Sequence, residues 1–356
     1  MMEIKFIERK ELKEKPDMST VTFGSTFTDY MLTASYNEEN GWHDWTIEPY
    51  GPIQLAPTAV VLHYAQTVFE GLKAYNVNGE AVLFRPNENF ARLNRSLERM
   101  SMAKIDEDDA LFALKELLKV EKDWIPTGEG QSLYIRPFVF GDDHTLGVHP
   151  STTYKFMILL SPVGGLFSAG TMGTTKIYVE DKFVRAVRGG VGEAKTGGNY
   201  AASMKAQEVA QALGYDQVLW LDGVEQKYLE EVGAMNIFYV QNGELFTPQL
   251  NGSILPGVTR KSIIEFAKDA GYTVNEARIP LEDLDAGLKD GSITEVFGAG
   301  TAAVVAPVGE LNIHGNKYVV GDGNVGPVAK EIYTTLTGIQ NGKVEDKFNW
   351  IVKVDE

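Results

Sequence analysis

A run of glycines and other small residues, GGLFSAGTMGTT at 164–175, divides the sequence into two halves. The run has neither the apolar spacing of a helix nor that of a strand, which is typical of a linker. The chain has 356 residues, more than one hydrophobic core usually supports. We therefore predict a small N-terminal domain over 1–165, a linker over 166–175 and a large C-terminal domain over 176–356.

Helix and strand patterns occur in both halves. Residues 88–100 and 108–124 place apolar side chains at helical spacing, and YKFMILLSPV has the composition of a strand. In the second half, a helical pattern ends at Gly214, and Asn242-Gly243 is typical of the turn of a β-hairpin. The sequence therefore predicts the α/β (α+β) class for both domains, without fixing the order of the strands.

Charge and composition exclude several kinds of partner. The formal net charge is -16, whereas nucleic acids and anionic membranes are bound by clustered lysine and arginine. No run approaches the roughly 18 apolar residues of a membrane helix. The first residues, MMEIKFIERKELKEK, lack the apolar stretch of a signal peptide. We expect a cytoplasmic protein that binds neither nucleic acid nor a membrane.

The sequence contains no cysteine, which excludes disulfides, thiolate nucleophiles and cysteine-based zinc sites. Its five histidines form no HExxH motif. We therefore expect no metal in the site.

Lys195 lies in a segment unusually rich in glycine, GGVGEAKTGGNY at 189–200. One interpretation is a P-loop, G-x-x-x-x-G-K-[ST], which Gly189, Lys195 and Thr196 fit. Ala194 stands where that motif requires its second glycine, however, and RAVRGG precedes the segment where an apolar strand is needed. The P-loop of a nucleotide triphosphatase is therefore the weaker alternative.

The other interpretation is a lysine that forms a Schiff base with pyridoxal 5'-phosphate (PLP). A lysine amine is a nucleophile only when neutral, and burial or nearby positive charge lowers its usual pKa of roughly 10.4. PLP chemistry also needs a carboxylate against the pyridine nitrogen, a donor to the phenolic oxygen and an anion site for the phosphate. Partners of these types do follow in the sequence.

Eight motifs make the chain resemble the branched-chain-amino-acid aminotransferases, PLP enzymes of fold type IV. They are FTDYM (27–31), FEGLKAY (69–75), LFRPNENFARL (83–93), YIRPF (134–138), KTGGNYAAS (195–203), LEEVGAMNIF (229–238), LPGVTR (255–260) and EVFGAGTAAVVAPV (295–308). The resemblance implies a two-domain, D-amino-acid aminotransferase-like fold with the active site at the domain interface. It also implies PLP as cofactor and a homodimer.

The resemblance also implies which residues bind the cofactor: Arg92, Lys195, Tyr200, Glu231, Val258, Thr259 and Thr301. Lys195 would be the catalytic base and hold PLP, and Tyr200 would donate to the phenolic oxygen. Glu231 would pair with the pyridine nitrogen, with Glu230 as its rival if the alignment slips by one. Arg92 would bind the phosphate, helped by the other three residues.

The placement of LPGVTR has an independent physical reason. A Pro-Gly turn opens the helical pattern TRKSIIEFAKDAG, so the free N–H groups of its first turn would face an anion.

Substrate contacts are implied in the same way, and they are Phe27, Tyr64, Phe69, Gly71, Tyr134, Arg136, Leu166, Ala234, Thr301 and Ala302, with Leu146 and Val148 from the partner subunit. Apolar walls would hold the branched side chain, and Arg136 would bind the distal carboxylate of glutamate. Ala234 departs from the pattern, because some members of the family have threonine there.

The implied reaction transfers the amino group of L-Leu, L-Ile or L-Val to 2-oxoglutarate, and the reverse, by a ping-pong mechanism that handles amino acids and 2-oxo acids in turn. Another fold type IV enzyme, such as a D-amino-acid aminotransferase or an aminodeoxychorismate lyase-like protein, would share Lys195 and Glu231. A protein that holds PLP without turnover is a further alternative. The sequence does not rank the substrates, fix a biosynthetic or degradative role, or settle assembly beyond a dimer.

Overall fold

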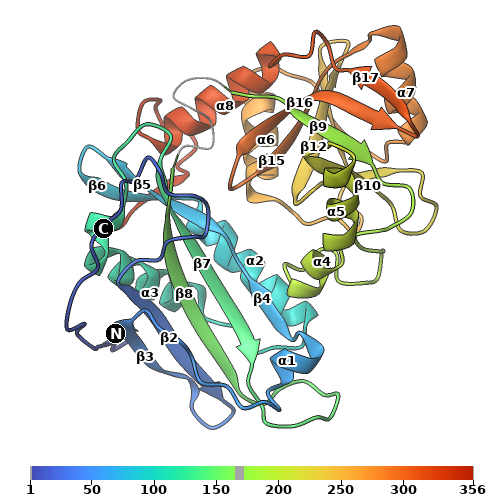
Figure 1. Ribbon diagram of the computed structural model, residues 1–356. Helices are drawn as coiled ribbons and strands as arrows, with labels where there is room; N and C mark the ends of the chain where they lie inside the picture. The colour runs from blue at the N-terminus through green and yellow to red at the C-terminus, as the bar shows by residue number, and fades with distance from the viewer. Residues whose placement is uncertain (1, 165–171, 356) are drawn as a thin grey trace. The chain divides into compact units, whose positions relative to one another are not determined.

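The computed structural model describes residues 2–164 and 172–355, and Figure 1 shows its helices and strands. The chain forms two compact units that are not continuous in sequence. Unit 1 comprises Met1–Ala169, Ala194–Gly197 and Gly338–Glu356, and unit 2 comprises Gly170–Glu193 and Gly198–Thr337. Both units mix helices with strands, so the predicted α/β (α+β) class is confirmed.

Two short segments group differently from the predicted domain boundaries. Residues 338–356 and 194–197 were expected in the second domain, but they belong to unit 1. The C-terminal strand β18 (Ile351–Lys353) pairs antiparallel with β6 (Glu80–Phe84). The segment around Lys195 joins unit 1 through a bridge between Val68 and Thr196. Both pairings link residues far apart in the sequence, so no local pattern announces them.

Unit 1 is built on a nine-stranded sheet with the order β1-β3-β2-β8-β7-β5-β6-β18, and β4 also pairs with β7. Its remaining strands are β1 (Lys5–Phe6), β2 (Tyr30–Asn37), β3 (Gly41–Pro49), β4 (Thr67–Phe69), β5 (Leu72–Val77), β7 (Ser132–Gly141) and β8 (Tyr154–Val163). Its helices are α1 (Val60–Tyr64), α2 (Pro86–Arg99), α3 (Glu107–Val120) and the 3-10 turn η1 (Lys122–Trp124).

The core of unit 1 lies between this sheet and helices α2 and α3. Leu93 and Leu97 on α2 and Leu114 and Leu117 on α3 are buried in one apolar cluster with strand residues such as Leu32. Helix α2 begins with a proline at its first position, where the missing N–H costs nothing. Helix α3 is capped by Asp106, whose side chain accepts from the backbone N–H groups of Asp108 and Asp109, both at 3.0 Å. These are the two helices predicted at 88–100 and 108–124, shifted by a few residues.

Unit 2 contains a second nine-stranded sheet, in the order β11-β10-β9-β16-β15-β12-β13-β14, with β17 paired to β16. The strands are β9 (Thr175–Val179), β10 (Gln217–Leu221), β11 (Leu229–Val232), β12 (Met235–Gln241), β13 (Glu244–Pro248), β14 (Val274–Ala277), β15 (Ile293–Gly300), β16 (Val304–Ile313) and β17 (Asn316–Val319). The helices are α4 (Gly197–Ala201), α5 (Met204–Ala212), α6 (Val258–Asp269), α7 (Leu281–Asp290) and α8 (Pro327–Gln340).

An additional pairing of β11 with β12 closes part of this sheet into a ring, β11-β10-β9-β16-β15-β12. The interior is apolar, with buried residues such as Leu219, Ile237 and Val296. Closing the ring leaves no free edge along these strands. The predicted hairpin is present: Asn242 and Gly243 both have positive φ and join β12 to β13. Among the described residues, no helix is long and apolar enough to cross a membrane.

Candidate active site

The Lys195 segment is fixed within unit 1 by its backbone. The Lys195 N–H donates to Ser96 Oγ of α2 at 2.9 Å, and its carbonyl accepts from the Phe69 N–H at 3.0 Å. The Thr196 hydroxyl donates to the Thr67 carbonyl at 2.7 Å. The glycine-rich segment is therefore held between α2 and β4. It is not a P-loop, because the preceding strand β9 ends at Val179, well before Gly189.

The Lys195 side chain lies in an apolar and positively charged environment. Its Nζ is 4.8 Å from the centroid of the Phe69 ring. Burial is the main cause that lowers the Lys195 pKa to about 8, and the charge of Arg92 lowers it further. The carboxylate of Glu70 acts in the opposite direction. The amine is thus much closer to neutrality at physiological pH than an exposed lysine, as a nucleophile or general base requires.

A buried ion pair lies next to this lysine. Glu70 Oε1 accepts from Arg92 Nε at 2.7 Å, and Glu70 Oε2 accepts from Arg92 Nη2 at 2.8 Å. Asn89 Nδ2 and the Gly71 N–H also donate to Glu70 Oε2, at 2.8 and 3.1 Å. Despite its burial, the Glu70 carboxyl has a lowered pKa, because Arg92 and Lys195 favour its ionised form. Sequence reasoning identified Arg92 but missed Glu70.

Three of the expected substrate residues lie together on β4 and β7. The guanidinium of Arg136 lies over the Phe69 ring at 4.7 Å and over the Tyr134 ring at 5.3 Å. Arg136 Nη2 donates to Tyr134 Oη at 2.9 Å. Arg136 Nε is buried and has no hydrogen-bond partner within the described chain. Gly71 is required beside them, because a Cβ at this position would lie 2.1 Å from Tyr134 Oη.

The other substrate residues expected in unit 1 have separate surroundings. Phe27 stacks on Tyr50, with ring centroids 4.9 Å apart. Tyr64 is 40% exposed and donates to the Leu146 carbonyl. Leu146 and Val148 are 61% and 83% exposed, as side chains that reach a partner subunit would be. The expected contact at Leu166 lies outside the described residues.

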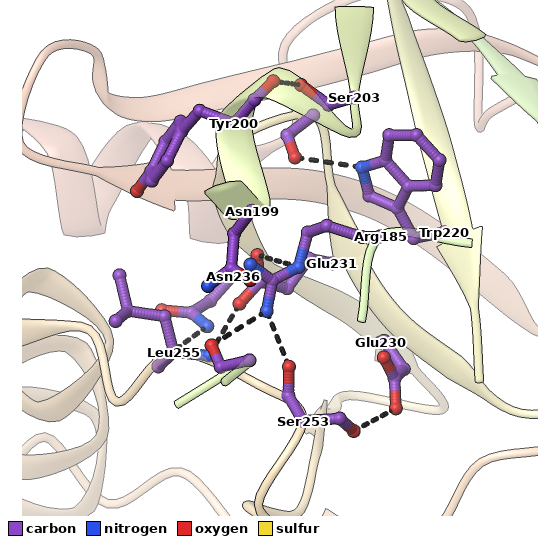
Figure 2. A network of polar contacts seen from close by, with 12 residues as sticks. Arg185, Asn199, Tyr200, Ser203, Trp220, Glu230, Glu231, Asn236, Ser253 and Leu255 are labelled. Atoms are coloured by element: carbon purple, nitrogen blue, oxygen red, sulfur yellow. Dashed lines mark hydrogen bonds and ion pairs between the residues drawn. The ribbon is translucent and has the colours of Figure 1, made fainter. Parts of the chain in front are cut away.

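Glu231 lies within unit 2 in a cavity of about 220 Å³, which is also lined by Tyr200 and Ala234. Figure 2 shows the polar contacts around it. The Leu255 N–H donates to Glu231 Oε1 at 2.7 Å, and Arg185 Nε lies 3.1 Å from Glu231 Oε2. Arg185 is itself held by the Gly192 and Ser253 carbonyls. Sequence reasoning missed Arg185, since KFVRAV carries no signal that distinguishes this arginine.

The two neighbouring glutamates have different environments because they alternate along β11. Glu230 does not line the cavity; it accepts from the Ser253 hydroxyl, and burial raises its pKa. Glu231 faces Tyr200 and Arg185. This arrangement favours Glu231 over Glu230 as the partner of a ligand in the cavity.

The phosphate-binding residues expected in unit 2 lie at two turns. Helix α6 begins at Val258, and its N-cap Gly257 offers no side-chain cap, so the first N–H groups have no partner within the helix. Gly257 cannot be larger, since a Cβ would lie 2.1 Å from Asn236 Oδ1. Thr301 and Ala302 form the turn between β15 and β16. Such a helix start suits an anion.

The described residues contain no group of three or more histidine, cysteine, aspartate or glutamate side chains that could hold a metal ion.

Comparison with known proteins identifies the class of enzyme. The sequence profile of the family Amino-transferase class IV matches residues 67–311. The chain therefore belongs to the class IV aminotransferases, and the resemblance expected from its motifs is confirmed.

Within that family, the similar relatives are named for branched-chain amino acids. A "Probable branched-chain-amino-acid aminotransferase" of Staphylococcus epidermidis is 58% identical over 99% of this chain and 98% of its own length. The "Branched-chain-amino-acid transaminase 1" of Bacillus subtilis is 56% identical over 98% of this chain and 99% of its own.

Solved structures agree with this assignment. The branched-chain amino acid aminotransferase of Escherichia coli is 30% identical with a TM-score of 0.77, and the match covers 92% of this chain and 99% of that one. The branched-chain amino acid aminotransferase of T.th., solved with pyridoxamine 5'-phosphate, is 27% identical with a TM-score of 0.74, over 91% of this chain and 98% of that one.

Proposed function

We propose that the chain is a branched-chain-amino-acid aminotransferase that uses PLP, held by Lys195, to exchange amino groups between L-Leu, L-Ile or L-Val and 2-oxoglutarate. The observation that carries the proposal is Lys195 itself, a buried lysine whose pKa is lowered to about 8. The family match and the names of relatives at 56–58% identity support the substrate class.

The residues present fit PLP. A buried amine near neutrality suits the aldehyde, and Glu231, ionised beside Arg185, suits a protonated pyridine nitrogen. Tyr200 lines the same cavity as Glu231 and would donate to the phenolic oxygen. The phosphate would be held by Arg92, Thr301 and the first N–H groups of α6, those of Val258 and Thr259. PLP, when bound, supplies an electron sink for negative charge at the substrate Cα.

The protein's own contribution is to hold and move protons. Lys195 Nζ, once displaced by the substrate amine, takes the Cα proton and later returns it, which needs a base with a pKa near the working pH. The Phe69 ring, 4.8 Å from Nζ, shields the amine from water and so keeps its pKa low. Arg185 holds the Glu231 carboxylate in place and favours its ionised form.

Substrate selection would depend on aromatic walls with one cation. Phe69 and Tyr134 would pack against an isobutyl or isopropyl group. The longer glutamate chain would place its carboxylate at Arg136, whose buried Nε has no hydrogen-bond partner within the described chain. A homodimer is part of the proposal, because Leu146 and Val148 are exposed in one chain and would complete the partner's pocket. We also propose a cytoplasmic location.

The absorption spectrum of the purified protein tests this function. We expect a visible cofactor band that leucine discharges and 2-oxoglutarate restores. Lys195→Ala should lose the band and essentially all turnover, because the mutation removes the nucleophile of a covalent mechanism. A band that responds to D-alanine but not to leucine would favour a D-amino-acid aminotransferase. A band that responds to no amino acid would mean that the protein holds PLP without turnover.

A further inference from the structure

We infer that Glu70 is a positioning residue for the cofactor phosphate, acting by fixing the guanidinium of Arg92. The inference rests on the proposed role of Arg92 as a phosphate ligand and assigns a function to a carboxylate that touches neither substrate nor cofactor in that proposal. Glu70 and Arg92 are 0% and 4% exposed.

The geometry of the pair leaves the arginine little freedom. The contacts to Nε and Nη2, at 2.7 and 2.8 Å, engage one whole edge of the guanidinium. Such two-point pairing fixes both the position and the plane of an arginine head group, which a single contact does not. Without it, a long side chain with several rotatable bonds would be held only by packing.

The carboxylate is itself fixed from two directions. Asn89 lies one helical turn before Arg92 on α2, and its Nδ2 donates both to Glu70 Oε2 and to the Gly71 carbonyl, at 2.8 and 3.2 Å. The Gly71 N–H donates to the same oxygen at 3.1 Å. Glu70 follows directly after β4, the strand whose Phe69 N–H binds the Lys195 carbonyl. One carboxylate therefore ties the arginine on α2 to the strand that carries the Lys195 segment.

A purely stabilising role is a weak explanation for this pair. Moving two charges out of water is costly, and a buried ion pair often stabilises a fold no better than apolar residues of the same volume. The charges also oppose each other electrostatically. Glu70 would repel a phosphate dianion, so if orientation did not matter, its removal should strengthen phosphate binding. Positioning and simple neutralisation thus predict opposite signs.

Glu70→Gln tests this, because the amide keeps the size of the side chain but turns one acceptor into a donor facing Arg92. The dissociation constants of the apoenzyme for PLP and for pyridoxal, which lacks the phosphate, are measured by absorbance titration. We expect PLP to bind about tenfold more weakly, the order of one lost charged hydrogen bond. Pyridoxal binding should change much less. Taking the ratio of the two cancels any effect of Glu70 on the reactivity of Lys195.

Arg92→Lys and the double variant complete the test. Arg92→Lys keeps the charge but removes the two-point pairing, and it should also lower the preference for PLP over pyridoxal. Adding Glu70→Gln to Arg92→Lys should then cause no further loss, because the carboxylate acts only through the arginine. Glu121→Gln, which neutralises another buried carboxyl of unit 1, is the control and should leave both affinities unchanged.

Three results would overturn the inference. An unchanged or increased preference for PLP in Glu70→Gln would mean that Glu70 only neutralises charge. Equal weakening of PLP and pyridoxal would indicate a general effect on the fold or on Lys195. In both cases a loss in Arg92→Lys would leave the phosphate role of Arg92 intact. If Arg92→Lys itself keeps the full preference for PLP, the proposed phosphate ligand is wrong, and the inference fails with it.

Discussion

At the scale of single residues, the reactivity of Lys195 depends on how its neighbours share charge. Burial and Arg92 lower its pKa to about 8, and Glu70 raises it. An isolated lysine at the surface would keep a value near 10.5 and would be almost fully protonated at neutral pH. The environment therefore provides a usable fraction of free amine without any separate base.

A pH profile of the apoenzyme tests this charge balance. The rate at which pyridoxal reacts with Lys195 should rise with pH and level off above a midpoint near 8, since only the neutral amine attacks. In Glu70→Gln the midpoint should move to lower pH, because a neighbour that favours the charged amine has been lost. A midpoint near that of a free lysine would show that the amine is solvated.

The two halves of the reaction make different demands on Arg136. Arg136→Met should slow the single-turnover reaction with 2-oxoglutarate by about tenfold or more, the order of a lost charged hydrogen bond. The leucine half-reaction should keep most of its rate, because its side chain carries no charge. Tyr134→Phe is a matched control, since it removes only the hydroxyl to which Arg136 donates. Equal losses in both half-reactions with Arg136→Met would show that the arginine is structural.

At the scale of elements, the N-terminal segment is tied to the start of β2 by charged groups. The Lys13 Nζ donates to the Phe27 and Thr28 carbonyls at 3.0 and 2.7 Å, and the Lys13 N–H donates to Asp29 Oδ1 at 2.7 Å. Glu121, at the end of α3, accepts from the Tyr30 N–H. The segment that carries Phe27 is therefore held from outside by Lys13 and from inside by Glu121.

The Glu121 carboxyl should make this anchorage sensitive to pH. Burial is the main cause that raises its pKa from 4.5 to about 7, and Asp29 adds to the effect. The folded state thus binds the proton more tightly than the unfolded state. The stability from this group is fully present below about 4.5 and is lost as pH rises through about 7.

Thermal unfolding of Glu121→Gln, which mimics the protonated form, tests this. Over that pH window the natural protein should lose melting temperature relative to the variant. Glu129→Gln is a useful contrast, since Lys343 lowers the pKa of this exposed carboxyl and any difference should be small and of opposite sign. Parallel curves for the natural protein and Glu121→Gln would contradict the raised pKa.

Local signals predicted local structure well, and pairings between distant segments not at all. Asn242-Gly243 and the apolar spacing of α2 are contained in a few consecutive residues, so both could be predicted. The motifs identified Lys195 and Arg92 through resemblance. Glu70 was missed because its role depends on which side chain of α2 it meets. The pairing of β18 with β6 joins the two ends of unit 1 across all of unit 2, and no sequence period encodes it.

At the scale of the whole molecule, the lack of cysteine determines how the enzyme responds to oxidants. Ala303 and Ala306 stand where some members of the family carry a cysteine pair, so a thiol switch has no residues to act on. Thiol-alkylating agents should leave turnover unchanged at doses that spare other side chains. Rapid inhibition that a reducing thiol reverses would contradict this expectation, and an enzyme with a known reactive cysteine serves as the positive control.

The position of β18 also has a consequence for the order in which the chain can fold as it leaves the ribosome. Strand β6 is translated early, but the strand that covers its edge follows only after the whole of unit 2. Until then β6 presents an unpaired edge to other nascent chains. The same late segment supplies the Trp350 carbonyl that accepts from the Arg85 N–H at 2.7 Å, at the start of α2. The helix that bears Arg92 therefore acquires its final anchor last, and synthesis must be nearly complete before the cofactor can be bound tightly.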